Sequence, residues 1–255
     1  RWCKLVTILA YDLGAGSGRA IVGRLTDHRI VTQEIHRFAN EPVKVGGHLY
    51  WDILRLYHEL QQGLVIAKQE RMIPDSIGID SWAVDFGLIG RSGELLGNPY
   101  HYRDPHTNGM MEQLIDELTA AHIFEATGIQ FLSFNTLYQL ATLRRNGSSL
   151  LSEAQHLLMI PDLLRYFMTG EMMNEFTNAT TTQLYNARQQ EWDRRLLSHI
   201  GVPSSWFSKL VQPGTPAGRL RSSLMEDLGL PSIPVTAVAE HDTASAVVAV
   251  PALSD

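Results

Sequence analysis

Two short strings, far apart in the sequence, carry residue types that suit phosphate chemistry. The first is DLGAGSGR, Asp12–Arg19, in which three glycines lie between a carboxylate and a guanidinium. The second is EHDTASAV, Glu240–Val247, in which two carboxylates precede a run of small residues. Glycine lets the backbone approach a phosphate closely, and a carboxylate accepts a proton or holds a metal ion. Each string alone also has an ordinary structural explanation.

The glycine string matches neither of two familiar phosphate motifs. The dinucleotide fingerprint needs a glycine where Arg19 stands, and the following RAIVGRL continues as a strand rather than a helix. The Walker A motif needs a Gly-Lys-Ser/Thr ending that is absent here. A hairpin loop still turns backbone N–H groups toward phosphate oxygens, with Arg19 adding charge and Asp12 serving Mg²⁺. An ordinary glycine-rich hairpin explains these residues equally well.

Asp242 is the candidate general base. It stands where an apolar strand, Ile233–Val238, gives way to a small-residue helix. In phosphoryl transfer a carboxylate at such a place accepts the proton of the attacking hydroxyl. The alternative is a helix cap, in which Asp242 accepts a bond from the backbone N–H of Ala244 or Ser245.

The elements that position these strings begin with a hairpin succession. Alternating or β-branched apolar residues predict strands over Leu5–Leu13, Arg19–Leu25 and Ile30–Phe38. Apolar residues then recur every three or four positions, which predicts a helix over Trp51–Glu70, before a strand over Ser76–Asp80. This order differs from the strict βαβ alternation of a dinucleotide fold and predicts a mixed sheet.

The middle of the chain, Pro105–Thr169, has mostly helical character. One helix is expected to begin at Asn135 or Thr136, and another to begin at Pro161 and end at Gly170. A further helical run, DRRLLSHI, follows Trp192. Helices are therefore expected to flank the sheet.

Composition excludes several classes of protein. The formal net charge of −6 over 255 residues argues against a protein that tracks nucleic-acid phosphates. The single cysteine, Cys3, forms no internal disulfide and no cysteine zinc cluster. No apolar run is long enough to span a bilayer, and no histidines have the spacing of a zinc motif. We expect a cytoplasmic protein that binds small molecules, with no nucleic-acid or membrane partner.

Six strings together, in fixed order, carry a family resemblance: DLGAGSGR, SIGIDSWAVDF, YRDPHTNG, GIQFLSFNTLYQL, TNATTTQL and EHDTASAV. Over roughly Val6 to Val250 the chain resembles the FGGY carbohydrate kinases, and among them those that phosphorylate L-rhamnulose. The resemblance implies an α/β fold, the ribonuclease H-like or actin-like ATPase domain, with a mixed sheet flanked by helices. It also implies that residues 1–255 form the N-terminal, sugar-binding lobe, inactive alone, with a C-terminal lobe beyond Asp255.

The resemblance assigns roles to individual residues. It implies ATP and Mg²⁺ as cofactors and a ketose as substrate, with transfer of the γ-phosphate to the 1-hydroxyl of L-rhamnulose. The implied ATP contacts are Ala15, Gly16, Ser17, Gly18 and Arg19; Asp12 would serve Mg²⁺, Asp242 would be the base, and Ala83, His241, Asp242 and Thr243 would line the sugar site. The familiar pattern has glycine where this chain has Ala83, so L-fuculose and L-xylulose remain alternative substrates.

Other readings remain open at this point. Asp12, Asp80 and Asp85 could gather around two metal ions, as in nucleases of the same fold. A sugar-binding module without catalysis is a third possibility. Trp82 is expected in the core unless the sugar pocket adjoins it, and Arg103 and Asp104 are expected to form a structural ion pair. The kinase hypothesis requires that the glycine hairpin and Asp242 face one cleft.

Overall fold

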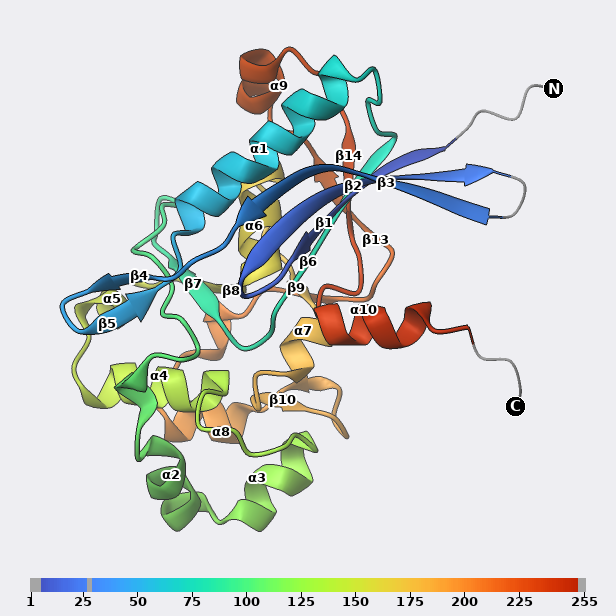
Figure 1. The fold of residues 1–255 in the computed structure, drawn as a ribbon. Coiled ribbons are helices and arrows are strands. Elements are labelled where there is room, and N and C mark those ends of the chain that lie inside the picture. Colours follow the sequence, from blue (N-terminus) through green and yellow to red (C-terminus); the bar gives the residue numbers. More distant parts are fainter. Residues whose placement is uncertain (1–5, 27–28, 252–255) are drawn as a thin grey trace.

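A six-stranded mixed sheet forms the centre of the upper part of the molecule (Figure 1). The computed structural model describes residues 6–26 and 29–251, so Cys3, the predicted strand start at Leu5 and Asp255 lie outside the described residues. The strands, in spatial order, are β13 (Thr215–Arg219), β14 (Pro234–Ala237), β6 (Ser76–Ser81), β1 (Thr7–Leu13), β2 (Ser17–Thr26) and β3 (Arg29–Ala39). β6 is parallel to both β1 and β14, and the other neighbours are antiparallel. The predicted mixed sheet is confirmed.

Helix α1 (Ile53–Gln69) covers one face of this sheet. The Asp52 side chain caps its start by accepting the Arg55 N–H, and its buried stripe includes Leu60 and Leu64, as predicted. Leu54, which was expected on that stripe, is 59% exposed. Gly63 is required where the helix approaches β1, because a Cβ there would lie 2.8 Å from the Tyr11 ring.

Two more helices, α6 (Ile160–Thr169) and α9 (Ser222–Leu228), join the same core. Pro161 lies in the first turn of α6, and Gly170 ends it in the left-handed conformation, as the sequence predicts. Leu163 and Leu164 of α6 pack in one cluster with Ile77 of β6. The sheet is thereby fixed from the side that α1 covers.

The lower part of the molecule is a mainly helical body with its own core (Figure 1). Its helices are α2 (Met110–Leu118), α3 (Ala120–Thr127), α4 (Thr136–Arg145), α5 (Ser149–Glu153) and α8 (Arg194–His199). A strand pair that the sequence did not predict, β7 (Phe86–Ile89) with β8 (His156–Met159), runs antiparallel beside this core. The predicted helix start at Asn135 or Thr136 is confirmed by α4.

Short elements complete the described chain. They are β4 (Val43–Val45), β5 (His48–Tyr50), β9 (Asn174–Glu175), α7 (Phe176–Thr180), β10 (Tyr185–Asn186), β11 (Glu191–Trp192), β12 (Leu210–Val211) and the 3₁₀ turns η1 (Pro105–Thr107) and η2 (Ser204–Trp206). Within the described ranges, no helix combines the length and the apolar character that crossing a membrane requires.

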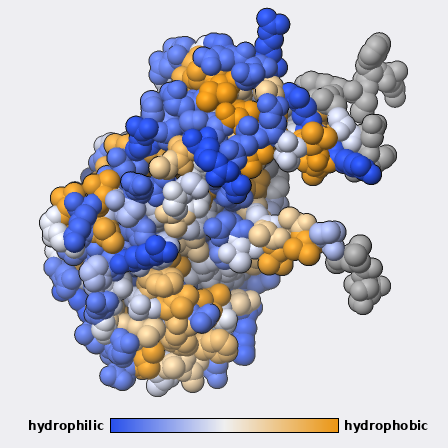
Figure 2. Space-filling view, viewed as in Figure 1, coloured by the Kyte–Doolittle hydropathy of each residue, from blue (hydrophilic) through white to orange (hydrophobic). Residues whose placement is uncertain are grey.

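The last helix, α10 (Asp242–Ala249), projects from the body (Figure 1). None of its residues is buried. Val247, Val248 and Val250, at its C-terminal end, are 68%, 81% and 67% exposed, and the projecting segment is largely apolar in the space-filling view (Figure 2). The position of α10 therefore depends on the turn that precedes it rather than on burial of its own side chains.

Candidate active site

The two chemically suggestive strings meet at one cleft, which has a volume of about 510 Å³. Ala15, from the turn between β1 and β2, lines it together with His241, Asp242 and Thr243 at the start of α10. Ala83 lines it as well. The cleft lies between the sheet and the helical body, since its remaining lining comes mostly from residues 129–135. The required juxtaposition of the glycine hairpin and Asp242 is present.

Asp12 lies beside two charged side chains in the sheet. It stands opposite Arg19 in the β1–β2 register and forms an ion pair with it. In the parallel β1–β6 register its neighbour is Asp80. Burial, together with the negative charges of Asp12 and Asp242, raises the pKa of the Asp80 carboxyl to about 7. Asp12, Asp80 and Asp242 are thus close enough to interact electrostatically.

The carboxylates of Asp12 and Asp80 fit a site for Mg²⁺ carried by a nucleotide. Asp80 Oδ1 is buried and has no hydrogen-bond partner. The described residues hold no group of three or more side chains suited to a metal ion. Mg²⁺ nevertheless commonly binds through one or two carboxylates, with water and substrate phosphates supplying the rest. That Asp12 serves Mg²⁺ remains a prediction, and Asp80 is the neighbouring carboxylate that could bind the same ion.

The glycine loop is anchored by a side chain that the sequence did not single out. The Gly14 N–H donates to the Ser17 carbonyl at 2.9 Å, which closes the turn. Asn40, only 4% exposed, donates its backbone N–H to the Gly16 carbonyl at 3.1 Å and its Nδ2 to the Gly14 carbonyl at 2.8 Å. The loop therefore has a fixed shape without a ligand.

Packing requires glycine at position 18 of the loop but not at position 16. A Cβ on Gly18 would lie 2.3 Å from the Phe38 ring, so the fold itself excludes a side chain there. A Cβ on Gly16 would meet nothing within 4 Å. Packing within the described chain therefore does not require glycine at position 16, whose backbone is open to approach.

Asp242 is the first residue of α10, and the capping position belongs to His241. Its Oδ1 accepts the Thr243 N–H at 2.6 Å and the Thr243 hydroxyl at 3.1 Å. The Ser245 N–H donates instead to the His241 carbonyl at 3.0 Å. The side chain is 37% exposed, so the carboxylate is accessible from solvent.

The turn that carries Ala83 is strained and held from both sides. Val84 has φ of 65°, which is rare for a β-branched residue. The Thr136 hydroxyl donates to the Val84 carbonyl at 2.6 Å, and the Val84 N–H donates to the Thr181 hydroxyl at 3.3 Å. Such strain persists only where the surroundings enforce it, and it concentrates at functional sites.

Asp85 does not join the other carboxylates. Its carboxylate is buried and accepts bonds from four donors: Trp51 Nε1 at 2.6 Å, Trp82 Nε1 at 3.1 Å, the Tyr102 N–H at 3.1 Å and Gln139 Nε2 at 2.8 Å. Burial raises the pKa of Asp85 to about 7. The trio of Asp12, Asp80 and Asp85 that a two-metal nuclease would need is therefore not assembled.

Sequence reasoning missed most of the cleft's apolar wall. This wall consists of Trp82, Val84, Tyr102, Ile129, Leu132 and Phe134. The signal was present, because Tyr102 stands in YRDPHTNG and the last three stand in GIQFLSFNTLYQL. Trp82 is both a core residue, 6% exposed, and a lining residue.

Asp104 has a structural role, although not with the expected partner. It is 3% exposed and accepts the Leu49 N–H at 2.6 Å. Its Oδ1 also contacts the ring nitrogens of His48 and His106. Arg103 instead lies 5.2 Å from the centre of the Tyr102 ring, at the edge of the cleft wall.

Comparisons with known proteins agree with this geometry. The model of the FGGY family of carbohydrate kinases, N-terminal domain, matches residues 7–249. A rhamnulokinase of Bacteroides thetaiotaomicron is 46% identical over 244 residues, which cover 96% of this chain and 50% of that protein. A rhamnulokinase of Oceanobacillus iheyensis is 43% identical over 95% of this chain and 52% of its own length. The chain spans about half the length of the curated relatives it matches.

Solved structures show the same fold at lower identity. A gluconate kinase from Lactobacillus acidophilus superposes with a TM-score of 0.82 at 18% identity, over 92% of this chain and 48% of that one. A ligand-bound xylulose kinase from the same organism gives 0.81 at 18% identity, over 91% and 47%. The predicted actin-like α/β fold is thereby confirmed.

Proposed function

Because the chain belongs to the FGGY family of carbohydrate kinases, we propose that it forms the sugar-binding lobe of an ATP-dependent rhamnulokinase. The reaction would transfer the γ-phosphate of ATP to the 1-hydroxyl of L-rhamnulose. The product would be L-rhamnulose 1-phosphate, an intermediate of L-rhamnose catabolism. Rhamnulokinases at 41–46% identity support this substrate.

The observation that carries the proposal is the single cleft between the glycine loop and Asp242. Phosphoryl transfer needs the donor phosphate, the attacking hydroxyl and a proton acceptor within a few ångströms of one another. Ala15 and Asp242 border the same space of about 510 Å³, which is large enough for a sugar and the terminal phosphates. The apolar wall and the polar residues at the start of α10 would hold the sugar between them.

Asp242 is the base in this mechanism. The sugar's 1-hydroxyl oxygen attacks the γ-phosphorus, the bond from that phosphorus to the β,γ-bridging oxygen breaks, and ADP leaves. The hydroxyl proton passes to the Asp242 carboxylate. Its partly exposed place at the helix start keeps the carboxylate available for this transfer. A loose transition state needs little basicity, so an ordinary carboxylate suffices.

The β1–β2 turn would bind the nucleotide. Ala15, Gly16, Ser17, Gly18 and Arg19 would face the ATP phosphates through backbone N–H groups and one guanidinium. Asp12 and Asp80 would hold Mg²⁺, which neutralises phosphate charge when bound. Arg19, now paired with Asp12, would divide its charge between that carboxylate and the phosphates.

The half of the related rhamnulokinases that this chain does not cover is also needed for activity in this proposal. We propose that a second lobe, corresponding to the half of the rhamnulokinases not covered here, supplies the adenine pocket. The 255-residue chain alone would then bind sugar with little turnover, and the whole enzyme would work in the cytoplasm. Coupled ADP release, measured with and without the second lobe, tests this division.

Replacing Asp242 is the decisive test of the base. Asp242→Asn in the full-length protein should lower kcat about 1,000-fold, since a positioned base contributes up to about 10⁴-fold. The sugar Kd, measured by calorimetry, should change little because the side chain keeps its size and its contact with Thr243. Near-normal kcat in this variant would remove Asp242 from the mechanism.

Ala83 keeps other ketoses under consideration. Its methyl group lines the cleft where the family pattern has glycine, so it changes the shape of the sugar site. A panel of L-rhamnulose, L-fuculose and L-xylulose in the ADP-release assay ranks the substrates by kcat/KM. A higher value for another ketose would replace the proposed substrate and keep the reaction.

A further inference from the structure

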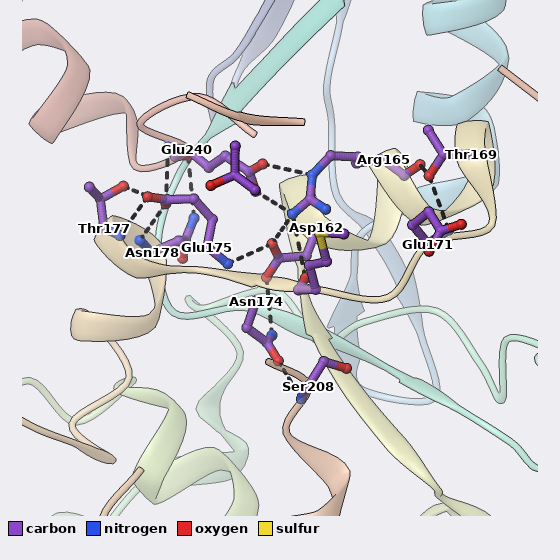
Figure 3. A network of polar contacts seen from close by, with 12 residues as sticks. Asp162, Arg165, Thr169, Glu171, Asn174, Glu175, Thr177, Asn178, Ser208 and Glu240 are labelled. Carbon is purple, nitrogen blue, oxygen red and sulfur yellow. Dashed lines mark hydrogen bonds and ion pairs between the residues drawn. The ribbon is translucent and has the colours of Figure 1, made fainter. Parts of the chain in front are cut away.

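A polar network with a buried centre lies next to the turn that carries the candidate base (Figure 3). Its centre is Arg165 of α6, which is 1% exposed. Three carboxyl groups surround it, from Asp162, Glu175 and Glu240, each 0% exposed. Glu240 precedes Asp242 by two residues, so the network reaches the catalytic turn directly.

Arg165 bridges the catalytic turn to helix α6. Its Nε donates to Glu240 Oε1 at 2.8 Å, and its Nη2 donates to Asp162 Oδ1 at 2.5 Å. A planar guanidinium holds two acceptors in fixed relative positions, which an ammonium group does not. The Glu240 carboxylate is therefore held at a fixed distance from the Arg165 guanidinium and in a fixed orientation to it.

The buried carboxyl groups outnumber the cation, which favours their protonated forms. Burial raises the pKa of Glu240 well above its usual range and raises the pKa of Asp162 as well. The neighbouring Asp162 also raises the pKa of Glu240, whereas the charge of Arg165 lowers both pKa values. Within this cluster Glu240 accepts from Arg165.

The backbone of Glu240 is held as firmly as its side chain. Its N–H donates to Glu175 Oε2 at 3.2 Å, and its carbonyl accepts the Ser81 N–H at 3.0 Å. The next residue, His241, donates its N–H to the Thr177 hydroxyl at 3.2 Å. Strand β6 and the start of α7 therefore fix the turn up to the residue before Asp242.

Beyond that point the hydrogen bonds of the described chain are local: the Ser245 hydroxyl donates to the Ala239 carbonyl, and Asp242 Oδ1 accepts from Thr243. Helix α10 has no buried residue, so packing of its side chains does not set the place of Asp242. We propose that Arg165, acting through Glu240, is a positioning residue that sets the orientation of Asp242 toward the attacking hydroxyl. This inference rests on the proposed function of Asp242 as the base.

The test is a double-mutant cycle in the full-length enzyme with Arg165→Lys and Asp242→Asn. Arg165→Lys keeps the charge and loses the bridge, so kcat should fall about 10-fold while the KM for ATP stays within about twofold. In the Asp242→Asn background the same change should cost less than about twofold, because no base is left to position. An equal loss in both backgrounds would overturn the proposal.

Two Glu240 variants test the same contact in case Arg165→Lys does not fold. Glu240→Gln preserves an acceptor for Arg165, so its loss in kcat should be below about threefold. Glu240→Leu removes that acceptor and should lose about 30-fold. Equal losses in the two variants would contradict the positioning role. Ile200→Val, a core substitution at the end of α8, controls for general destabilisation and should leave kcat unaltered.

A measurement without turnover separates this inference from the proposed function. Hydrogen exchange in Arg165→Lys should accelerate at the amides of Glu240 and His241, and not at those of β6 residues 77–79. If the full-length protein phosphorylated no ketose, the kinase proposal would fail. The exchange rates at Glu240 and His241 would still show whether Arg165 stabilises the turn before Asp242. Unchanged exchange at Glu240 and His241 would overturn the positioning role.

Discussion

The two walls of the cleft differ in chemistry and in how they are held. On the sheet side Asp242 lines the cleft, and Asp12 and Asp80, which are not lining residues, lie within electrostatic reach of it. The helical side is apolar, and Ile129, Leu132 and Phe134 of the loop before α4 form half of its apolar lining residues. The first wall is suited to charge and proton movement, and the second to contact with the sugar.

This difference predicts that the two walls control different kinetic constants. Groups that act on the phosphate or the proton contribute mainly in the transition state, so removing them lowers kcat. Groups that contact the sugar equally before and during reaction mainly set KM. Substitutions on each wall therefore test the comparison, and the largest effect is expected on the sheet side.

Asp12→Asn should have the largest effect among these tests. With the negative charge at the β1 end removed, kcat should fall about 100-fold and the Mg²⁺ concentration needed for half-maximal rate should rise. The sugar KM should stay within about twofold, because Asp12 does not line the described cleft. Glu34→Gln, which breaks an exposed ion pair with Arg37 on the same sheet, is the matched control. A raised sugar KM with normal kcat would contradict the prediction that the sheet side controls kcat and the helical side controls the sugar KM.

Phe134→Ala tests the helical wall. The ring lines the cleft and lies 5.5 Å from the Tyr102 ring, so its loss removes apolar contact with the sugar. The sugar KM should rise about 10-fold while kcat changes less than about threefold. Phe131→Ala is the control, since Phe131 packs against the second core and is not part of the described lining. A similar KM in both variants would show that the wall does not bind the sugar.

Local patterns predicted the sheet side better than the helical side. Alternating residues identified β1, β2 and β3, and three-to-four spacing identified α1, because each pattern is contained within its own segment. Strands β7 and β8 escaped detection because each is a short, almost wholly apolar run without alternation. Their pairing also joins segments about 70 residues apart, which no local pattern records.

The site shows the same limit at the level of single residues. Asp80 and Asp85 look equivalent in SIGIDSWAVDF, yet one faces Asp12 and the other lies among indole donors. The turn between them decides this, and it depends on Val84 at positive φ, where sequence rules expect glycine or asparagine. The hydroxyls that hold Val84 come from distant segments. Only the assembled fold therefore separates the two carboxylates.

The smallest effect expected here is the change in the stability of the folded protein in Asp80→Asn, which is measured separately from any loss of rate through Mg²⁺. The folded protein raises the pKa of Asp80 from 3.8 to about 7, so the native state binds this proton more tightly than the unfolded chain. Wild-type stability from this group is complete below about pH 4 and is lost as pH rises through 7. Asparagine carries no charge to bury, so the variant should be more stable at pH 8, on the order of 1 kcal/mol, and nearly equal at pH 4.

Urea unfolding at the two pH values, first without Mg²⁺, measures this gain. Asp116→Asn, which removes an exposed carboxylate from α2, is the control and should show no comparable dependence on pH. Adding Mg²⁺ with nucleotide should shrink the difference, because a bound cation would stabilise the ionised Asp80 carboxylate in wild type. If the difference in the free energy of unfolding between Asp80→Asn and wild type were the same at pH 4 and pH 8, the folded protein would not raise the pKa of Asp80. The two sides of the cleft would then differ in polarity alone, because ionised Asp80 would not destabilise the nucleotide-free protein.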